Sequence, residues 1–131
     1  DMEKEFWCVG GGVIGPGVTR AIIPDGARAT VIVTFNGVPA GAFNTGVTFT
    51  VDGGGAETFT GAAAGPGAND VTYTASSDFV AGEVVRWLYT PGNITVGGEA
   101  LPSQDKLVDN QIVAAPVVQS LNVTQTEVVV P

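Results

Sequence analysis

One stretch, residues 82–101, constrains the fold of this chain more than any other. Within it, Val85, Trp87 and Tyr89 occupy every second position. Successive side chains of a β-strand point to opposite faces, so these three large apolar groups share one face. A sheet face that bears both a tryptophan and a tyrosine needs a second layer to cover it. The stretch therefore predicts a core strand of a β-sandwich.

The rest of the chain reads as further short strands separated by turns. The composition, with 19 glycines and 8 prolines and no helical period, favours strands over helices. Turn signals occur at Asp25-Gly26, Asn36-Gly37, Asp52–Gly55 and Pro91-Gly92. Between them, strands are expected at 18–24, 29–35, 47–51, 57–61, around Val71 and Tyr73, at 94–96, and around Leu107, Val108 and Ile112, with a loop at 62–68. This spacing predicts an all-β fold, an antiparallel β-sandwich.

The chain of 131 residues is long enough for one domain with a segment at either end. We expect a Gly-rich N-terminal arm at 1–17, the sandwich at 18–113, and a C-terminal linker and strand at 114–131. The last segment alternates again from Val117 to Val130. It is either another strand of this domain or the first strand of a following unit.

The expected arm carries the main candidate interaction site. Phe6, Trp7, Cys8 and Val9 form a large apolar group, and the glycine-rich residues 10–17 follow it. Glycines cost too much backbone entropy to form regular structure alone, but they give the segment reach. We expect these four side chains to dock on a surface, either of their own domain or of a neighbouring subunit.

The order of features from residue 29 to 110 resembles that of a known family. The pieces that carry the likeness are Thr30–Phe35, Gly46–Val51, Tyr89–Ile94, Gly98–Leu101 and Val108–Asn110. They are similar to motifs in Ig-like β-sandwich repeats of bacterial surface proteins and phage virion structural proteins, of the SwmB type. That resemblance implies an Ig-like antiparallel β-sandwich that serves as a spacer, display or decoration module, and it supplies no catalytic residues. The chain departs from the family pattern at Glu99, where asparagine is usual, so the chemistry of that turn differs.

Charge and composition bear on partners and cofactors. The net charge is −8, from 13 acidic and 5 basic residues, which disfavours nucleic acid and anionic membranes as partners. No apolar run reaches the roughly 18 residues that a membrane span needs, so no membrane insertion is expected. The chain has no histidine, and Cys8 is its only cysteine, which removes Cys-His and Ser-His nucleophile pairs and leaves Cys8 as a free thiol. We expect no cofactor.

Several weaker motifs could mark functional sites but also have ordinary structural explanations. Gly10, Gly12 and Gly15 match the dinucleotide-binding spacing, but a strand rather than a helix is expected after them. Carboxylates for glycoside hydrolysis would come from Asp70, Asp78, Glu83 and Glu99, all in turns or at strand ends. Calcium ligands would come from Asp52, Asp70 and Asp78, and glycosylation sequons begin at Asn93 and Asn122. Solvated turns explain the acidic residues better than catalysis or calcium binding does, and chance matches explain the glycine spacing and the sequons.

Together, these features predict a non-enzymatic structural protein. The expectation is a virion component, such as a capsid decoration, a fibre or a tail accessory module, located in the virion. Its arm would hold it to protein partners in a repeated assembly, with homo-oligomeric contacts. The alternative is a bacterial cell-surface or secreted adhesion module, one repeat of a longer chain.

Overall fold

The computed structural model describes residues 15–115. The expected arm residues Phe6, Trp7, Cys8 and Val9, and the expected C-terminal strand after Pro116, lie outside the described residues. All regular elements of the described part are strands. In chain order they are β2 Val18–Ile23, β3 Thr30–Phe35, β4 Pro39–Gly41, β5 Val47–Val51, β6 Gly61–Ala64, β7 Asp70–Thr74, β8 Val85–Tyr89, β9 Ile94–Val96, β10 Glu99–Ala100, β11 Gln104–Leu107 and β12 Asp109–Asn110.

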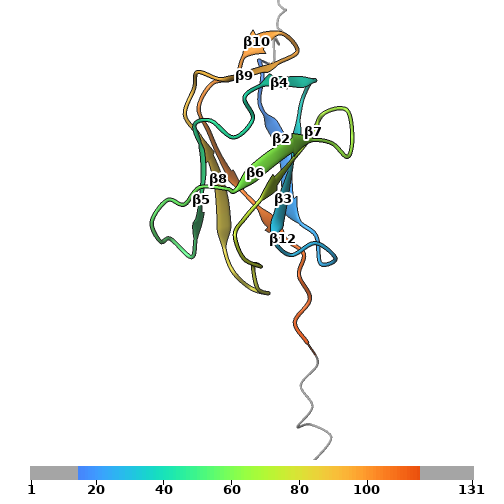
Figure 1. Cartoon of the computed structure of the whole chain (residues 1–131), viewed down its shortest axis with the longest axis vertical. Coiled ribbons are helices and arrows are strands. Elements are labelled where there is room, and N and C mark those ends of the chain that lie inside the picture. The colour runs from blue at the N-terminus through green and yellow to red at the C-terminus, as the bar shows by residue number, and fades with distance from the viewer. Residues whose placement is uncertain (1–14, 116–131) are drawn as a thin grey trace, which may run out of the picture.

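Two sheets form the sandwich (Figure 1). A five-stranded sheet has the order β12-β2-β3-β7-β6, and a three-stranded sheet has the order β11-β8-β5. Within them, β2-β3-β7-β6 and β5-β8-β11 reproduce the A-B-E-D and C-F-G orders of an Ig constant-type sandwich. All pairs are antiparallel except β12 with β2. The predicted all-β sandwich is confirmed.

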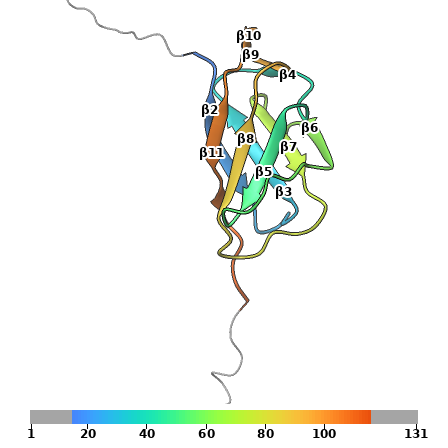
Figure 2. The ribbon, with the colours of Figure 1, turned by 90° about the vertical axis from the view of Figure 1, so that its left-hand side faces the viewer.

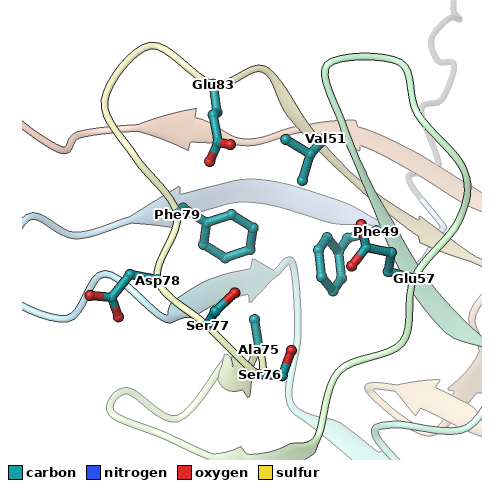
Figure 3. Close-up of a pocket in the computed structure, with 9 residues that line it drawn as sticks. All are labelled: Phe49, Val51, Glu57, Ala75, Ser76, Ser77, Asp78, Phe79 and Glu83. Atoms are coloured by element: carbon teal, nitrogen blue, oxygen red, sulfur yellow. The ribbon is translucent and has the colours of Figure 1, made fainter.

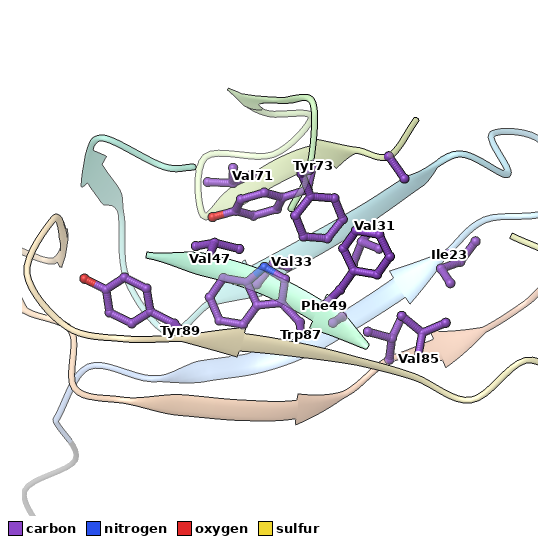
Figure 4. Packing of buried hydrophobic residues seen from close by; sticks show 14 of the residues in the cluster. Ile23, Val31, Val33, Val47, Phe49, Val71, Tyr73, Val85, Trp87 and Tyr89 are labelled. Carbon is purple, nitrogen blue, oxygen red and sulfur yellow. The ribbon is translucent and has the colours of Figure 1, made fainter. Parts of the chain in front are cut away.

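The core lies between the sheets and is built from the alternating residues of the central strands. Trp87 of β8 is completely buried, as are Val31 and Val33 of β3. The indole packs against Tyr73 of β7 with a centroid separation of 5.6 Å and against Tyr89 at 6.2 Å (Figure 4). The assignment of Trp87 to the core is confirmed. An aromatic platform for a ligand would instead require an exposed ring.

The end of the described chain changes sheets. β11 pairs with β8, and two residues later β12 pairs in parallel with β2. The amide of Val108 donates to the Val85 carbonyl at 2.8 Å, and the amide of Gln111 donates to the Ile23 carbonyl at 2.9 Å. The single strand expected around Leu107, Val108 and Ile112 is therefore two short strands that connect the two sheets along one side of the sandwich.

The sequence-based assignment between Glu57 and Ala68 is wrong. Of the strand expected at 57–61, residues 57–60 form only an isolated bridge between Glu57 and Phe49, whereas β6 runs from Gly61 to Ala64, mostly within the expected loop. The reason is that Phe59 turns into the core, where its ring lies 4.5 Å from that of Phe49, while the chain crosses from one sheet to the other. The alanines that follow pair with β7 through the backbone, which needs no side-chain pattern.

A third, small sheet with the order β10-β9-β4 closes one end of the sandwich. The described chain enters at this end and leaves at the opposite end (Figure 2). We call these the entry end and the exit end.

Candidate functional site

A cleft with a volume of about 200 Å³ lies at the edge of the sandwich (Figure 3). Its lining comes from β5, the bridge at Glu57 and the loop that connects β7 to β8. The lining residues are Phe49, Val51, Glu57, Ala75, Ser76, Ser77, Asp78, Phe79 and Glu83.

The inner wall of this cleft is part of the hydrophobic core. The rings of Phe49 and Phe79 meet edge to face, with centroids 5.4 Å apart, and both side chains are buried. The amide of Phe79 donates to the Arg28 carbonyl at 2.8 Å, which fixes the loop against the β2–β3 turn. The cleft is therefore a shallow entrance above a closed core.

The carboxylates around the cleft do not form a catalytic pair. An oxygen of Glu83 accepts the amide of Val80 at 2.8 Å and so closes its own loop. In Figure 3, the Asp78 side chain points away from the cleft, and Glu57 and Glu83 lie on different sides of it. Among the predicted hydrolytic residues, the structure thus places Asp78 and Glu83 in one loop without directing them at a common point.

The remaining acidic candidates stabilise turns. Asp70 accepts the Thr34 hydroxyl at 2.7 Å and the amide of Gly67 at 2.9 Å. Asp52 accepts the amide of Val84 at 2.8 Å. Asp70 begins β7 whereas Asp78 follows its end, so the three aspartates considered as calcium ligands are not brought together. Within residues 15–115, no group of three or more acidic, histidine or cysteine side chains is arranged to hold a metal ion.

The other motifs also have structural explanations where the structure describes them. Gly15 leads into strand β2, so the helix that a dinucleotide site requires does not follow. Glu99 is exposed in β10, and Asn93 is exposed in the turn after β8. Cys8 and Asn122 lie outside the described residues.

Sequence reasoning missed an apolar groove at the exit end. It has a volume of about 450 Å³ and is lined by Gly82, Glu83, Val84, Leu107, Val108, Asp109 and Asn110. Two of the lining residues are large and exposed, Val84 at 51% and Leu107 at 53%. Val80, which is 56% exposed, lies beside the groove because its carbonyl accepts a hydrogen bond from the side-chain amide of Asn110. We call Val80, Val84 and Leu107 the exit patch. The available signal was Leu107, an apolar residue of the strand expected around Leu107, Val108 and Ile112.

The exit end is also held by a charged turn. Asp25 accepts the amide of Val113 at 3.0 Å and the Arg28 guanidinium at 2.7 Å. The hydrogen bond from Val113, followed by that from Arg28, lowers the pKa of the Asp25 carboxyl below its usual value. This turn fixes the position at which the chain leaves the sandwich.

No segment of the described part forms a helix long and apolar enough to cross a membrane. Comparison of the chain with protein-family models, with curated proteins and with solved structures finds no match.

Proposed function

We propose that this protein is a non-enzymatic structural subunit of a repeated assembly, specifically a virion component such as a capsid decoration, a fibre or a tail accessory module. One observation carries the proposal. The chain enters the sandwich at one end, and an exposed apolar groove lies at the other. Such an arrangement suits contacts that are repeated from subunit to subunit.

The chemistry of the described residues supports a role in contacts. The core is closed, and the acidic candidates Asp52, Asp70 and Glu83 each accept a hydrogen bond from a backbone amide. Their carboxylates are used to hold turns. Saturable hydrolysis of a polysaccharide or peptide, lost when Asp78 or Glu83 is replaced, would contradict the non-enzymatic role.

In this proposal the exit patch of one copy receives the aromatic segment Phe6–Val9 of the next. Gly15 follows Val9 by six positions, a reach of about 20 Å when extended. Burial of Phe6 and Trp7 would contribute roughly 1.5–3 kcal/mol for each side chain. Because the described chain enters at the end opposite the exit patch, the proposed contact is head-to-tail, and head-to-tail contacts continue from copy to copy in a ring or a row.

The test compares full-length variants by sedimentation velocity over a range of concentrations. The donor change is Phe6→Ser with Trp7→Ser, matched by Val13→Ser with Ile14→Ser. The acceptor change is Leu107→Glu, matched by Val38→Glu, because Val38 is 58% exposed outside the exit patch. We expect the donor and acceptor changes to weaken association while thermal unfolding stays unchanged. Association that is equal in all four variants would refute the arm contact.

The alternative is a bacterial cell-surface or secreted adhesion module, one repeat of a longer chain. The same observation favours it, since entry and exit at opposite ends let sandwiches follow one another in a row. Copies of the domain in tandem within one gene would support this alternative. Many separate copies on a purified particle would support the virion component.

A further inference from the structure

Strand β6 forms an open edge of the five-stranded sheet. Within residues 15–115, β7 is its only strand neighbour, because β6 stands last in the order β12-β2-β3-β7-β6. Its sequence is Gly-Ala-Ala-Ala, and Ala63 and Ala64 are exposed. An edge strand presents a row of backbone N–H and C=O groups that another strand can pair with. Here neither charge nor bulk blocks that approach.

The other edges of the two main sheets are protected. The outer side of β5 is bridged by Glu57, whose amide donates to the Phe49 carbonyl at 2.8 Å. β11 carries two charged side chains, and its Asp105 is paired with Arg86 at 2.8 Å. β12 is only two residues long. Natural sheets protect their edges with such charges, short strands and covering segments. β6 has four residues and carries no charged side chain, and no strand of the described residues pairs with its outer edge.

The chain contains a segment suited to this edge. Residues 117–130 include six valines and two threonines, types that favour strands, and a single charged residue, Glu127. The protein as a whole carries a net charge of −8, which makes contacts between copies unfavourable over most of the surface. The β6 strand carries no charged side chain and this segment carries one, so a contact between them adds little to that repulsion.

The topology favours a segment from a second copy. The described chain leaves the five-stranded sheet after β12, which is the edge opposite to β6. Four strand spacings separate the two edges, about 19 Å at about 4.8 Å each. The segment of the same copy would have to pass around the whole sheet to reach β6. A neighbouring copy can offer its own β6 edge directly, and the sheet then continues from one copy to the next.

We infer that the outer edge of β6 is a strand-acceptor site and that residues 117–130 of a second copy pair with it as an additional β-strand. Backbone hydrogen bonds supply the attraction, and the alanine side chains leave room for the valines. The inference rests on the proposed assembly role and names a second contact within it. Like the contact at the exit patch, this contact joins one copy to the next.

The direct test is disulfide cross-linking of the full-length chain in a Cys8→Ser background. One cysteine replaces Ala63, and a second replaces Val123 or, separately, Thr124, so that both faces of the added strand are sampled. The control pair moves the first cysteine to Ala40, which is exposed in β4. We expect covalent multimers on non-reducing gels with Ala63 and none with Ala40. A cross-link within one chain, or equal multimers with both, would overturn the inference.

A second measurement uses charge. Ala63→Lys introduces a natural edge-protecting residue on an exposed side chain, and Ala40→Lys makes the same change on β4. We expect Ala63→Lys, but not Ala40→Lys, to weaken association in sedimentation velocity while thermal unfolding stays unchanged. If the Phe6/Trp7 change abolishes association but Ala63→Lys does not, the β6 site is refuted and the arm contact stands. If Ala63→Lys weakens association and the Phe6/Trp7 change does not, the arm contact is refuted and the β6 site stands.

Discussion

At the scale of single residues, Tyr89 and Tyr73 are both buried but use their hydroxyl groups in opposite ways. The Tyr89 oxygen accepts the three successive amides of residues 92–94, at 3.1, 3.0 and 2.9 Å. The Tyr73 hydroxyl donates to the Phe43 carbonyl at 2.7 Å. Tyr89 thus shapes the turn after β8, whereas Tyr73 ties the loop before β5 to β7.

Replacement of Tyr89 by phenylalanine should therefore be costly although the ring is kept. Three amides lose their shared acceptor. The amide of Ile94 is the buried one, and an unpaired buried donor costs about 1–3 kcal/mol. Chemical denaturation should show a fall of that size in the free energy of unfolding. Tyr73→Phe, which leaves one carbonyl without its donor, serves as the matched control and should cost less. Equal losses in the two variants would show that the three amides find other partners.

Tyr73 also predicts a dependence of stability on alkaline pH. Burial, and secondarily the nearby Tyr89, raise the pKa of Tyr73 well above its usual value of 10.0. Above about pH 10 the unfolded chain loses this proton while the folded chain keeps it, so the free energy of unfolding falls as pH rises, by up to about 1.4 kcal/mol per pH unit. Below that pH the group has no such effect. Denaturation between pH 9 and 11.5 should show this fall, and Tyr73→Phe should reduce its slope. An unchanged slope in the variant would assign the fall to another group.

At the scale of elements, the small sheet at the entry end depends on one close backbone approach. Gly41 ends β4 with a φ of +108°, and a Cβ atom there would overlap the carbonyl oxygen of Asn93. β4 and β9 can pair only because the residue has no side chain. The sheet that closes this end thus relies on a glycine as well as on the burial of Ile94 and Val96 of β9.

Gly41→Ala should consequently destabilise the protein by more than about 1 kcal/mol, since both the φ angle and the space are wrong for a side chain. Gly26→Ala is the control, because a Cβ at Gly26 meets no atom within 4 Å and its φ is not in the left-handed region. Thermal unfolding of the two variants gives the comparison. Similar melting temperatures would mean that β4 can move away from β9 at little cost.

At the scale of the whole molecule, the sandwich is directional. The described chain enters beside the small sheet and leaves beside the exit patch, and the five-stranded sheet is closed by β12 on one edge and open at β6 on the other. The exit patch thus lies at the end opposite the point where the described chain enters. The β6 edge lies opposite the edge at which the described chain leaves the five-stranded sheet. Such contacts join different surfaces of successive copies, so they build either closed rings or open rows, and open rows are what a fibre or a surface array requires.

The sequence by itself determined the fold class and most of the core. The alternation in Val31, Val33 and Phe35 and in Val85, Trp87 and Tyr89 predicts which face is buried, because a strand has a period of two and large apolar groups must leave water. It also predicted the turn at Asp25-Gly26, where glycine follows a side chain that accepts hydrogen bonds.

Only the tertiary structure decided where the edges and the exposed apolar side chains lie. β6 has no side-chain pattern, and its place follows from backbone pairing with β7 after Phe59 has been drawn into the core. Leu107 resembles a core residue in the sequence, but β11 pairs with β8 in a register that places it opposite the exposed Arg86, on the outer face. A register is a relation between two segments distant in the chain, so neither segment contains it alone.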